Sequence, residues 1–304
     1  MKISEALTFL NSIGEKYEFM GESDTDILSY SPIKGLTNNS ISWIRKMSMN
    51  HLELIDKIQN ILIVCEDNSR EIVNSTHSKG NFIFVSNPHK AFFKILDHFF
   101  SVELYEKGIS ETAIVKATTV GRMCSIGNFS YIGSDVVLGN NVVIEHNVTI
   151  QGKTFIGDNT IIESGTVIGL CGFGHYKEEN GVSVRVPHLG GVRIGANCYI
   201  GSNCTIARGT LSDTIIGDYV KIDALCHIAH NVEIGNKVMI TGGTIIADDV
   251  WIGPNATINN ALNIGKHSLI GIGSVVTKEV PLDKAVFGVP ARALKDNFDN
   301  VYNS

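Results

Sequence analysis

The chain has 304 residues, of which 43% are hydrophobic and 18% are charged. This length allows a sizeable core and one to three domains. The formal net charge of −6 argues against a protein that binds nucleic acid through a basic surface. The first residues are unlike a secretory signal peptide, because they include several acidic side chains and no long apolar stretch. No apolar run in the chain is long enough to span a membrane. We therefore expect a cytoplasmic protein without a membrane span.

Residues 1–106 have the pattern of a small α/β domain. Ser4 is expected to cap a short helix that ends near Gly14. Asn87 is expected to cap a second helix, with Pro88 in its first turn. This domain either holds a substrate or covers the open end of the repeat that follows. Its other predicted elements are a helix over 51–58 and strands over 41–45, 61–65 and 82–85.

An aliphatic residue recurs at every sixth position through most of the remaining chain. Neither the helical period nor strand alternation explains a period of six. A coil with three short strands per turn does, with one buried anchor on each face and eighteen residues per turn. Eight turns give a prism roughly 35–40 Å long. The anchors are Ile114, Val120, Ile126, Ile132, Leu138, Ile144, Ile150, Ile156, Ile162, Ile168, Ile194, Ile200, Ile206, Ile216, Ile222, Ile228, Ile234, Ile240, Ile246, Ile252, Ile258, Ile264, Ile270 and Val276.

Two further positions of the repeat carry information. A glycine often follows the anchor, where a corner needs either a missing Cβ or a positive φ. The residue two before the anchor is small or β-branched, which predicts that it points into the narrow interior. Four cysteines occupy that position, namely Cys124, Cys198, Cys204 and Cys226, so we interpret them as core residues. No C-x-x-C pair is present, and neither a zinc site nor a disulfide framework is expected.

The repeat is interrupted twice, and a short tail follows it. The interruption at 170–191 is charged, glycine-rich and too long for a turn, which indicates a functional loop. The second interruption, 207–214, is a smaller bulge. The sequence thus predicts a mainly β protein with a small α/β domain over 1–106, a parallel coil over 107–280 and a tail over 281–304. The tail is expected to be extended, with one helical turn at its end.

Several motifs resemble one transferase family. The segment 188–243 closely resembles the UDP-3-O-acylglucosamine N-acyltransferases of lipid A synthesis, which are hexapeptide-repeat enzymes. Gly172-Phe173-Gly174 matches their glycine-rich loop, and Trp43 lies where their front domain stacks an aromatic ring on uracil. The resemblance implies a left-handed parallel β-helix, a homotrimer and a nucleotide-linked amino sugar as substrate.

The chain also departs from that family. Ala207 and Ala224 stand where an acid and an Asn are usual, and Met49 replaces a second stacking aromatic. The long helical extension is missing, and the segment 273–292 resembles the ending of sugar acetyltransferases that use acyl-coenzyme A. This combination is similar to the amino-dideoxysugar N-acyltransferases, as in anthrose synthesis. It predicts acyl transfer from acyl-CoA to a dTDP-4-amino-4,6-dideoxyhexose. The alternative is the lipid A reaction itself, with acyl carrier protein as donor.

The resemblance also implies roles for individual residues. Amide formation needs a base that accepts a proton from the attacking amine, and histidine suits this near neutral pH. His230, in the match Ile228–Asn231, is implied to be that base and to project outward into a cleft between subunits. In the alternative mechanism, His230 orients groups while the amine passes its proton directly to the leaving thiolate. The implied substrate contacts are Trp43, Asn231, Gly172, Phe173, Gly174 and His175.

The acyl donor has its own candidate contacts. Backbone N–H groups of Gly242 and Gly243 are expected to stabilise the thioester oxygen. Lys278 and Arg292 are candidate partners of coenzyme A phosphates. For His175 and His188 the alternatives are contact with a substrate phosphate and solvation, of which we favour solvation. His227 is either a neighbour of the site or a bystander.

Two other functions use the same coil. A lyase of the γ-carbonic anhydrase type needs three imidazoles around zinc, whereas only His227 and His230 lie close in this sequence. No metal is therefore expected. A non-catalytic scaffold is the second possibility, although it would not need a long loop or a base-like histidine.

Overall fold

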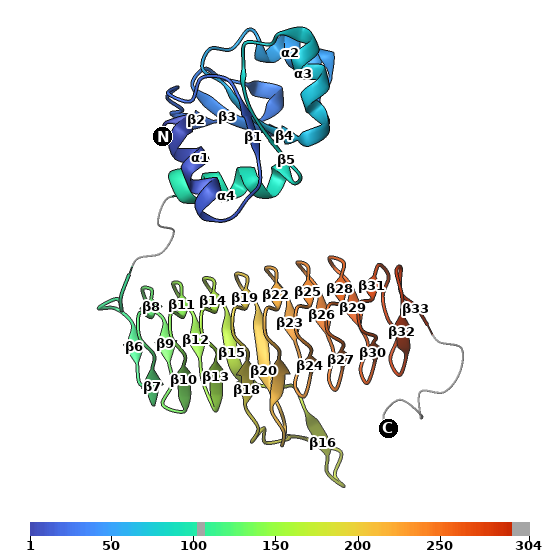
Figure 1. Ribbon diagram of the computed structural model, residues 1–304. Helices are drawn as coiled ribbons and strands as arrows, with labels where there is room; N and C mark the ends of the chain where they lie inside the picture. Colours follow the sequence, from blue (N-terminus) through green and yellow to red (C-terminus); the bar gives the residue numbers. More distant parts are fainter. Residues whose placement is uncertain (102–106, 294–304) are drawn as a thin grey trace. The chain divides into compact units, whose positions relative to one another are not determined.

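The computed structural model describes residues 1–101 and 107–293 and separates into two compact units, divided between residues 104 and 105. In Figure 1 the first unit runs from blue to cyan and the second from green to red. The predicted domain boundary at residue 106 lies outside the described residues. So does the helical turn predicted after Arg292–Ala293.

The first unit is a five-stranded sheet with a hydrophobic core on each face. Its strand order is β1-β5-β4-β3-β2, and only β1 is antiparallel to its neighbour. Alternate residues of β4 face opposite cores: Leu62 and Val64 pack with α1 and α4, whereas Ile63 and Cys65 pack with α2 and α3. The elements are α1 Ile3–Ser12, β1 Glu18–Met20, β2 Ser29–Tyr30, η1 Ile33–Gly35, β3 Ser40–Ile44, α2 Met49–Ile55, β4 Leu62–Glu66, η2 Asp67–Ser69, α3 Arg70–Thr76, β5 Asn81–Val85 and α4 Pro88–Phe100.

The structure confirms most predicted elements of this unit and corrects one cap. Asn87 does cap α4, because its Oδ1 accepts from Lys90 N at 3.0 Å. The first helix, however, begins at Ile3 with Lys2 at the N-cap, and Lys2 N donates to Glu5 Oε2 at 2.6 Å. Ser4 therefore lies inside the first turn. The capping partner is Glu5, three positions after the N-cap, and its carboxylate accepts a hydrogen bond from a backbone N–H that has no partner within the helix.

The second unit is a left-handed parallel β-helix built from three sheets (Figure 1). We call the three sheets I, II and III, and each turn of the coil contributes one strand to sheet III, then one to sheet I and then one to sheet II. Sheet I contains β7 Thr119–Val120, β10 Val136–Leu138, β13 Thr154–Ile156, β18 Val192–Ile194, β21 Thr214–Ile216, β24 Glu233–Ile234, β27 Trp251–Ile252, β30 Leu269–Ile270, β32 Ala285–Phe287 and β33 Arg292–Ala293. Sheet II contains β8 Ser125–Ile126, β11 Val143–Ile144, β14 Ile161–Ile162, β19 Tyr199–Ile200, β22 Lys221–Ile222, β25 Met239–Ile240, β28 Thr257–Ile258 and β31 Val275–Val276. Sheet III contains β6 Ile114–Val115, β9 Tyr131–Ile132, β12 Thr149–Ile150, β15 Val167–Cys171, β20 Thr205–Arg208, β23 His227–Ile228, β26 Ile245–Ile246 and β29 Asn263–Ile264.

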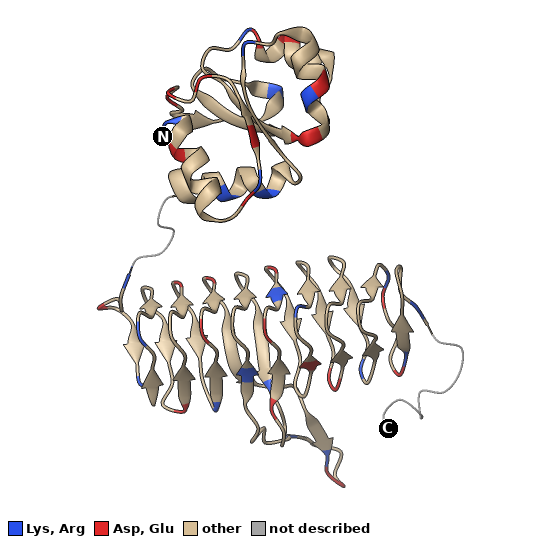
Figure 2. Cartoon of the chain, in the orientation of Figure 1, with Lys and Arg blue, Asp and Glu red and all other residues tan. Residues whose placement is uncertain are grey.

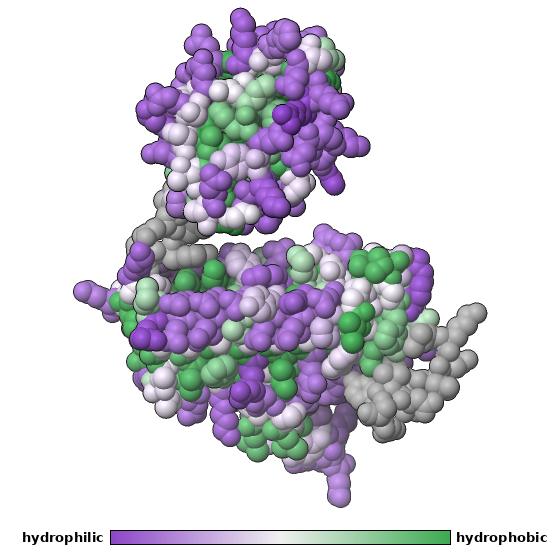
Figure 3. Space-filling model, viewed as in Figure 1, coloured by the Kyte–Doolittle hydropathy of each residue, from purple (hydrophilic) through white to green (hydrophobic). Residues whose placement is uncertain are grey.

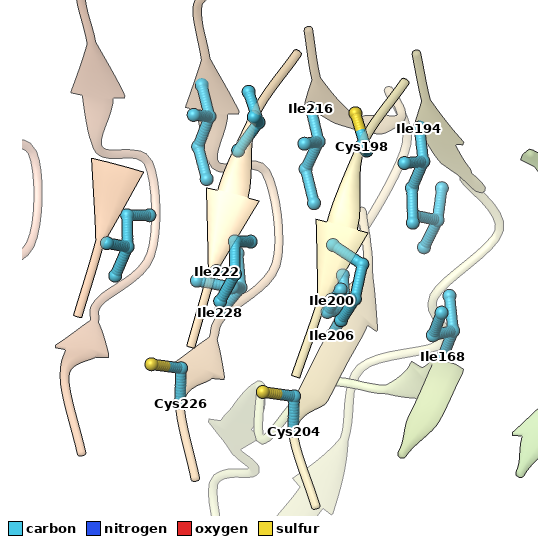
Figure 4. Packing of buried hydrophobic residues seen from close by; sticks show 14 of the residues in the cluster. Ile168, Ile194, Cys198, Ile200, Cys204, Ile206, Ile216, Ile222, Cys226 and Ile228 are labelled. Carbon is cyan, nitrogen blue, oxygen red and sulfur yellow. The ribbon is translucent and has the colours of Figure 1, made fainter. Parts of the chain in front are cut away.

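The predicted anchors form the core of the coil. Ile168, Ile206 and Ile228 are direct register partners on successive turns, and they stack in the interior (Figure 4). Every anchor from Ile126 to Val276 is buried. Ile114 is 55% exposed because it belongs to the first turn of the coil. The four cysteines predicted to point inward lie in the same core.

The structure also settles why glycine follows so many anchors. Positive φ values occur mainly three positions after the anchor, for example at Asn141 and Asn231; among the glycines that directly follow an anchor, Gly169 at the start of the long loop is the exception. A Cβ on Gly157 would lie 2.6 Å from the carbonyl carbon of Gly195 on the next turn. Glycine is thus required by the close approach of successive turns, and the left-handed corner residue is most often Asn.

Truncating an anchor should destabilise the coil far more than truncating its outward neighbour. In β24, Ile234 is 2% exposed whereas Glu233 is exposed. We expect Ile234→Ala to lower the free energy of unfolding by about 2–5 kcal/mol, because it leaves a cavity between stacked turns. Glu233→Ala should change it by less than about 0.5 kcal/mol. Denaturant melts of both variants measure the difference, and equal losses would contradict the assignment of the core.

Candidate functional site

Both interruptions of the repeat leave the coil at the same corner. The 170–191 loop connects β15 to β18, and the 207–214 bulge connects β20 to β21, so each joins sheet III to sheet I. We call this edge the loop corner. On the following turns it carries His230, Asp248 and Lys266. Figure 1 shows β16 (His175–Lys177), which pairs with β17 (Ser183–Arg185), projecting from the coil as the outer part of the first loop.

His230 lies in the middle of this corner. Its side chain is only 12% exposed. Nε2 lies 3.3 Å from Asp248 Oδ1, and Nδ1 lies 3.5 Å from Thr210 Oγ1. The imidazole thus stands between a carboxylate from the next turn and a hydroxyl from the bulge. His230 lies outside the interior of the coil, as predicted, but the loop covers it within a single chain.

The glycine-rich segment makes room for this ring. A Cβ on Gly172 would lie 2.4 Å from His230 Cδ2 and 2.7 Å from His188 Nε2. At Gly174 the nearest atom to such a Cβ, His188 Cε1, is 3.2 Å away. The main chain at Gly172 therefore packs directly against His230. This gives Gly172 a steric role that its predicted role in substrate binding did not include.

His188 is buried, and the prediction that it is solvated is wrong. It is 4% exposed, its ring centroid lies 4.9 Å from that of His230, and its Nδ1 lies 2.9 Å from Val186 O. Burial is the main cause that lowers the pKa of His188, and the nearby His230, Arg185 and Arg208 lower it further. The ring is then neutral, with Nδ1–H donating to Val186. Within the described residues, Nε2 has no hydrogen-bond partner.

Asn231 fixes the bulge beside His230. It occupies a left-handed corner position with φ of 60°. Its Oδ1 accepts from Thr210 N at 2.7 Å, and its Nδ2 donates to Asp249 Oδ1 at 3.0 Å. Both ends of the amide are therefore engaged within the chain. Asn231, predicted as a substrate contact, holds Thr210 in place next to the imidazole.

Other predicted contacts in the loop are open to solvent. Phe173 is 93% exposed, and its ring centroid lies 4.6 Å from that of His175, which is also exposed. His227, in contrast, lies on β23 with Nδ1 2.6 Å from Thr205 Oγ1, and burial lowers its pKa. Phe173 and His175 are thus accessible to a ligand, whereas His227 is engaged on the surface of sheet III.

The glycines predicted to bind the thioester oxygen require a correction. Gly242 N donates to Asp223 Oδ2 at 3.1 Å, and Gly243 N donates to Ala224 O at 3.1 Å. Both N–H groups are therefore used to hold successive turns together and are not free to stabilise an oxyanion. Lys278 and Arg292, the predicted coenzyme contacts, are exposed near the last turns of the coil.

Trp43 belongs to the first unit and lines a separate pocket. This pocket has a volume of about 680 Å³ and is mainly apolar, with Arg45 and His51 among its polar residues. The Trp43 ring meets His89 edge-on at 4.9 Å. We call this the tryptophan pocket. An open aromatic surface of this kind suits a planar base.

Positively and negatively charged residues both occur at several corners of the coil (Figure 2).

Within residues 1–101 and 107–293, no three His, Cys, Asp or Glu side chains are grouped so that they could hold a metal ion. The same ranges contain no helix that is long and apolar enough to cross a bilayer.

Comparison with known proteins points to one kind of repeat. The model of the bacterial transferase hexapeptide (six repeats) matches residues 117–152 and 213–247, and that of the hexapeptide repeat of succinyl-transferase matches 191–224. A UDP-3-O-acylglucosamine N-acyltransferase of Caulobacter sp. (strain K31) is 40% identical over 135 residues, which are 42% of this chain and 39% of the relative. The corresponding protein of Coxiella burnetii (strain RSA 493 / Nine Mile phase I) is 53% identical over 76 residues, 25% and 22% of the two chains.

The matches are partial in length. The chain spans less than half the length of the curated relatives it matches. Among solved structures, a UDP-N-acetylglucosamine acyltransferase from Campylobacter jejuni is 25% identical, with 62% of this chain and 74% of that chain covered and a TM-score of 0.40. The repeat models match the parts of the coil on both sides of the long loop. The β-helix of this chain therefore contains hexapeptide repeats similar to those of bacterial transferases.

Proposed function

We propose that this protein transfers an acyl group from a thioester to the amino group of a nucleotide-linked sugar, with His230 as general base. The observation that carries the proposal is the position of His230. It lies nearly buried where the loop and the bulge meet, with one ring nitrogen turned to the Thr210 hydroxyl. The partial relatives, which bear the name UDP-3-O-acylglucosamine N-acyltransferase, support the same chemistry.

The reaction needs only one proton carrier. The neutral imidazole accepts a proton from the amine as the nitrogen attacks the thioester carbonyl. The new C–N bond forms, and the tetrahedral intermediate then expels the thiolate as the C–S bond breaks. The imidazolium returns the proton to the thiolate and becomes neutral again. His230 is suited to both steps because the loop shields it from bulk water.

Two acceptor and donor pairs remain as candidates. The names of the relatives favour UDP-3-O-acylglucosamine as acceptor over the amino dideoxysugar predicted first. In this first candidate pair the proposed donor is acyl carrier protein. A dTDP-linked amino dideoxysugar with acyl-CoA is the second candidate. It is supported by the exposure of Lys278 and Arg292, which suits contact with coenzyme phosphates.

A homotrimer is part of the proposal. Outward positions of the coil carry apolar side chains: Phe155 is 38% exposed, Ile215 39% and Met239 51%. Figure 3 shows apolar patches between polar rows on the visible face of the coil. Contact between copies would cover such residues. Analytical ultracentrifugation tests this directly, and a stable monomer would contradict it.

A thiol-release assay tests the activity. UDP-3-O-acylglucosamine and dTDP-4-amino-4,6-dideoxyglucose are each offered with acyl-CoA and with acylated acyl carrier protein. We expect free thiol to appear only when an amine acceptor is present, with an amide product of matching mass. A folded protein that releases no thiol with any pair would favour the non-catalytic scaffold.

The tryptophan pocket should bind the nucleotide base. Stacking of a base on an aromatic ring contributes about 1–3 kcal/mol. We therefore expect Trp43→Ala to weaken binding of UDP or dTDP by roughly 10-fold or more in calorimetric titrations. Trp251→Ala is the matched control, because Trp251 lies on the coil in β27. An equal loss in both variants, or none in Trp43→Ala, would contradict this placement of the base.

A further inference from the structure

We propose that Asp248 is a positioning residue that holds the His230 imidazole by accepting its Nε2–H, so that Nδ1 is the nitrogen that takes the proton. This inference rests on the proposed function of His230. Asp248 follows β26 on the turn after His230, at the same corner. Because the turns repeat every eighteen residues, the coil places the two side chains in one column.

The geometry defines which nitrogen is engaged. Asp248 Oδ1 lies 3.3 Å from Nε2, whereas Nδ1 faces Thr210 Oγ1 at the longer distance of 3.5 Å. The other carboxylate oxygen of Asp248 lies 3.9 Å from Lys266 Nζ on the following turn. The carboxylate is thus oriented from both sides. A proton on Nε2 satisfies Asp248, and the lone pair on Nδ1 is left for the substrate.

The Asp248 carboxylate has a second effect, which is electrostatic and acts on the protonated form of the His230 ring. Arg185, Arg208 and the neutral His188 lie on the loop and bulge side of His230. Asp248 places a carboxylate oxygen 3.3 Å from Nε2 of the ring. It therefore stabilises the imidazolium that forms when the amine gives up its proton.

A second histidine at the same corner, His267, also lies beside carboxylates and can be compared with the His230–Asp248 pair. His267 lies 3.4 Å from Asp249 Oδ2 and 3.2 Å from Asp283 Oδ1, but its side chain is 49% exposed. His230 is 12% exposed and is covered by Gly172 and His188. A carboxylate beside a shielded imidazole acts more strongly than one beside an exposed ring, because water screens it less.

The test compares single and double variants in the thiol-release assay. We expect Asp248→Asn to lower kcat by about 10–100-fold with little change in KM for either substrate, because it acts on the base and not on binding. Asp248→Glu should recover part of the loss. The double variant His230→Ala/Asp248→Asn should be no slower than His230→Ala alone.

The control is Asp218→Asn, a corner carboxylate that accepts from Ala196 N at 2.7 Å and should leave kcat unchanged. Thermal melts check that each variant is folded. Wild-type kcat in Asp248→Asn, or a further loss in the double variant, would overturn the inference while His230→Ala remains inactive. Wild-type turnover in His230→Ala would instead remove the proposed role of His230, and with it this inference.

Discussion

Replacing His230 with alanine is expected to lower kcat by about 100- to 10,000-fold, the usual contribution of a general base. The ring lies outside the interior of the coil, with Thr210 and Asp248 as its polar neighbours, so its removal should leave the repeat intact. The thiol-release assay measures the loss, and thermal melting with ultracentrifugation checks fold and assembly. His267→Ala is the matched control, because it removes an imidazole from the same corner three turns after the bulge.

The size of the loss distinguishes two mechanisms. If the amine passes its proton directly to the leaving thiolate, His230 only orients groups, and its removal should cost much less than the loss of a base. Added imidazole should then give no rescue, whereas it should restore part of the activity if a proton acceptor is missing. A variant with wild-type turnover would exclude His230 from the reaction altogether.

The fold of the coil was predictable because an aliphatic residue recurs at every sixth position of the sequence. Outside the two interruptions each anchor is buried by its neighbours eighteen residues away, so a local pattern determines a long structure. The first unit was predicted less completely. β1, β2 and α3 are short, and their hydrophobic residues follow no clear period of their own. The cap of α1 was misassigned because Glu5 reaches back to Lys2, a contact that a preference for Ser at the N-cap does not include.

The site was predicted only in part, for a related reason. Asp248 lies eighteen residues after His230, so counting one full turn would have found it. Thr210 could not be found in this way, because the bulge breaks the register before His230. The burial of His188 depends on how the long loop folds back over the corner, and no repeat specifies that path. The resemblance implied that Gly242 and Gly243 are donors, but hydrogen bonds between turns already use both groups.

Gly172→Ala should abolish most activity without unfolding the protein, whereas Gly174→Ala in the same loop should have a much smaller effect. A methyl group at position 172 would lie 2.4 Å from His230 Cδ2, a distance that requires the ring or the loop to move. At position 174 the nearest atom is 3.2 Å away, so a small adjustment suffices. Neither glycine has a positive φ, so backbone strain does not separate the two variants.

The expected loss follows from the contacts that hold the ring. Asp248 and Thr210 flank the two ring nitrogens, so a ring displaced by the new methyl group loses its orientation toward the amine. A misplacement of about 1 Å can reduce a rate by roughly 100-fold. We expect a loss of this order in kcat for Gly172→Ala, with a melting temperature close to that of Gly174→Ala. Equal activity of the two variants would mean that the loop opens away from His230 before the reaction, and that Gly172 does not shape the site.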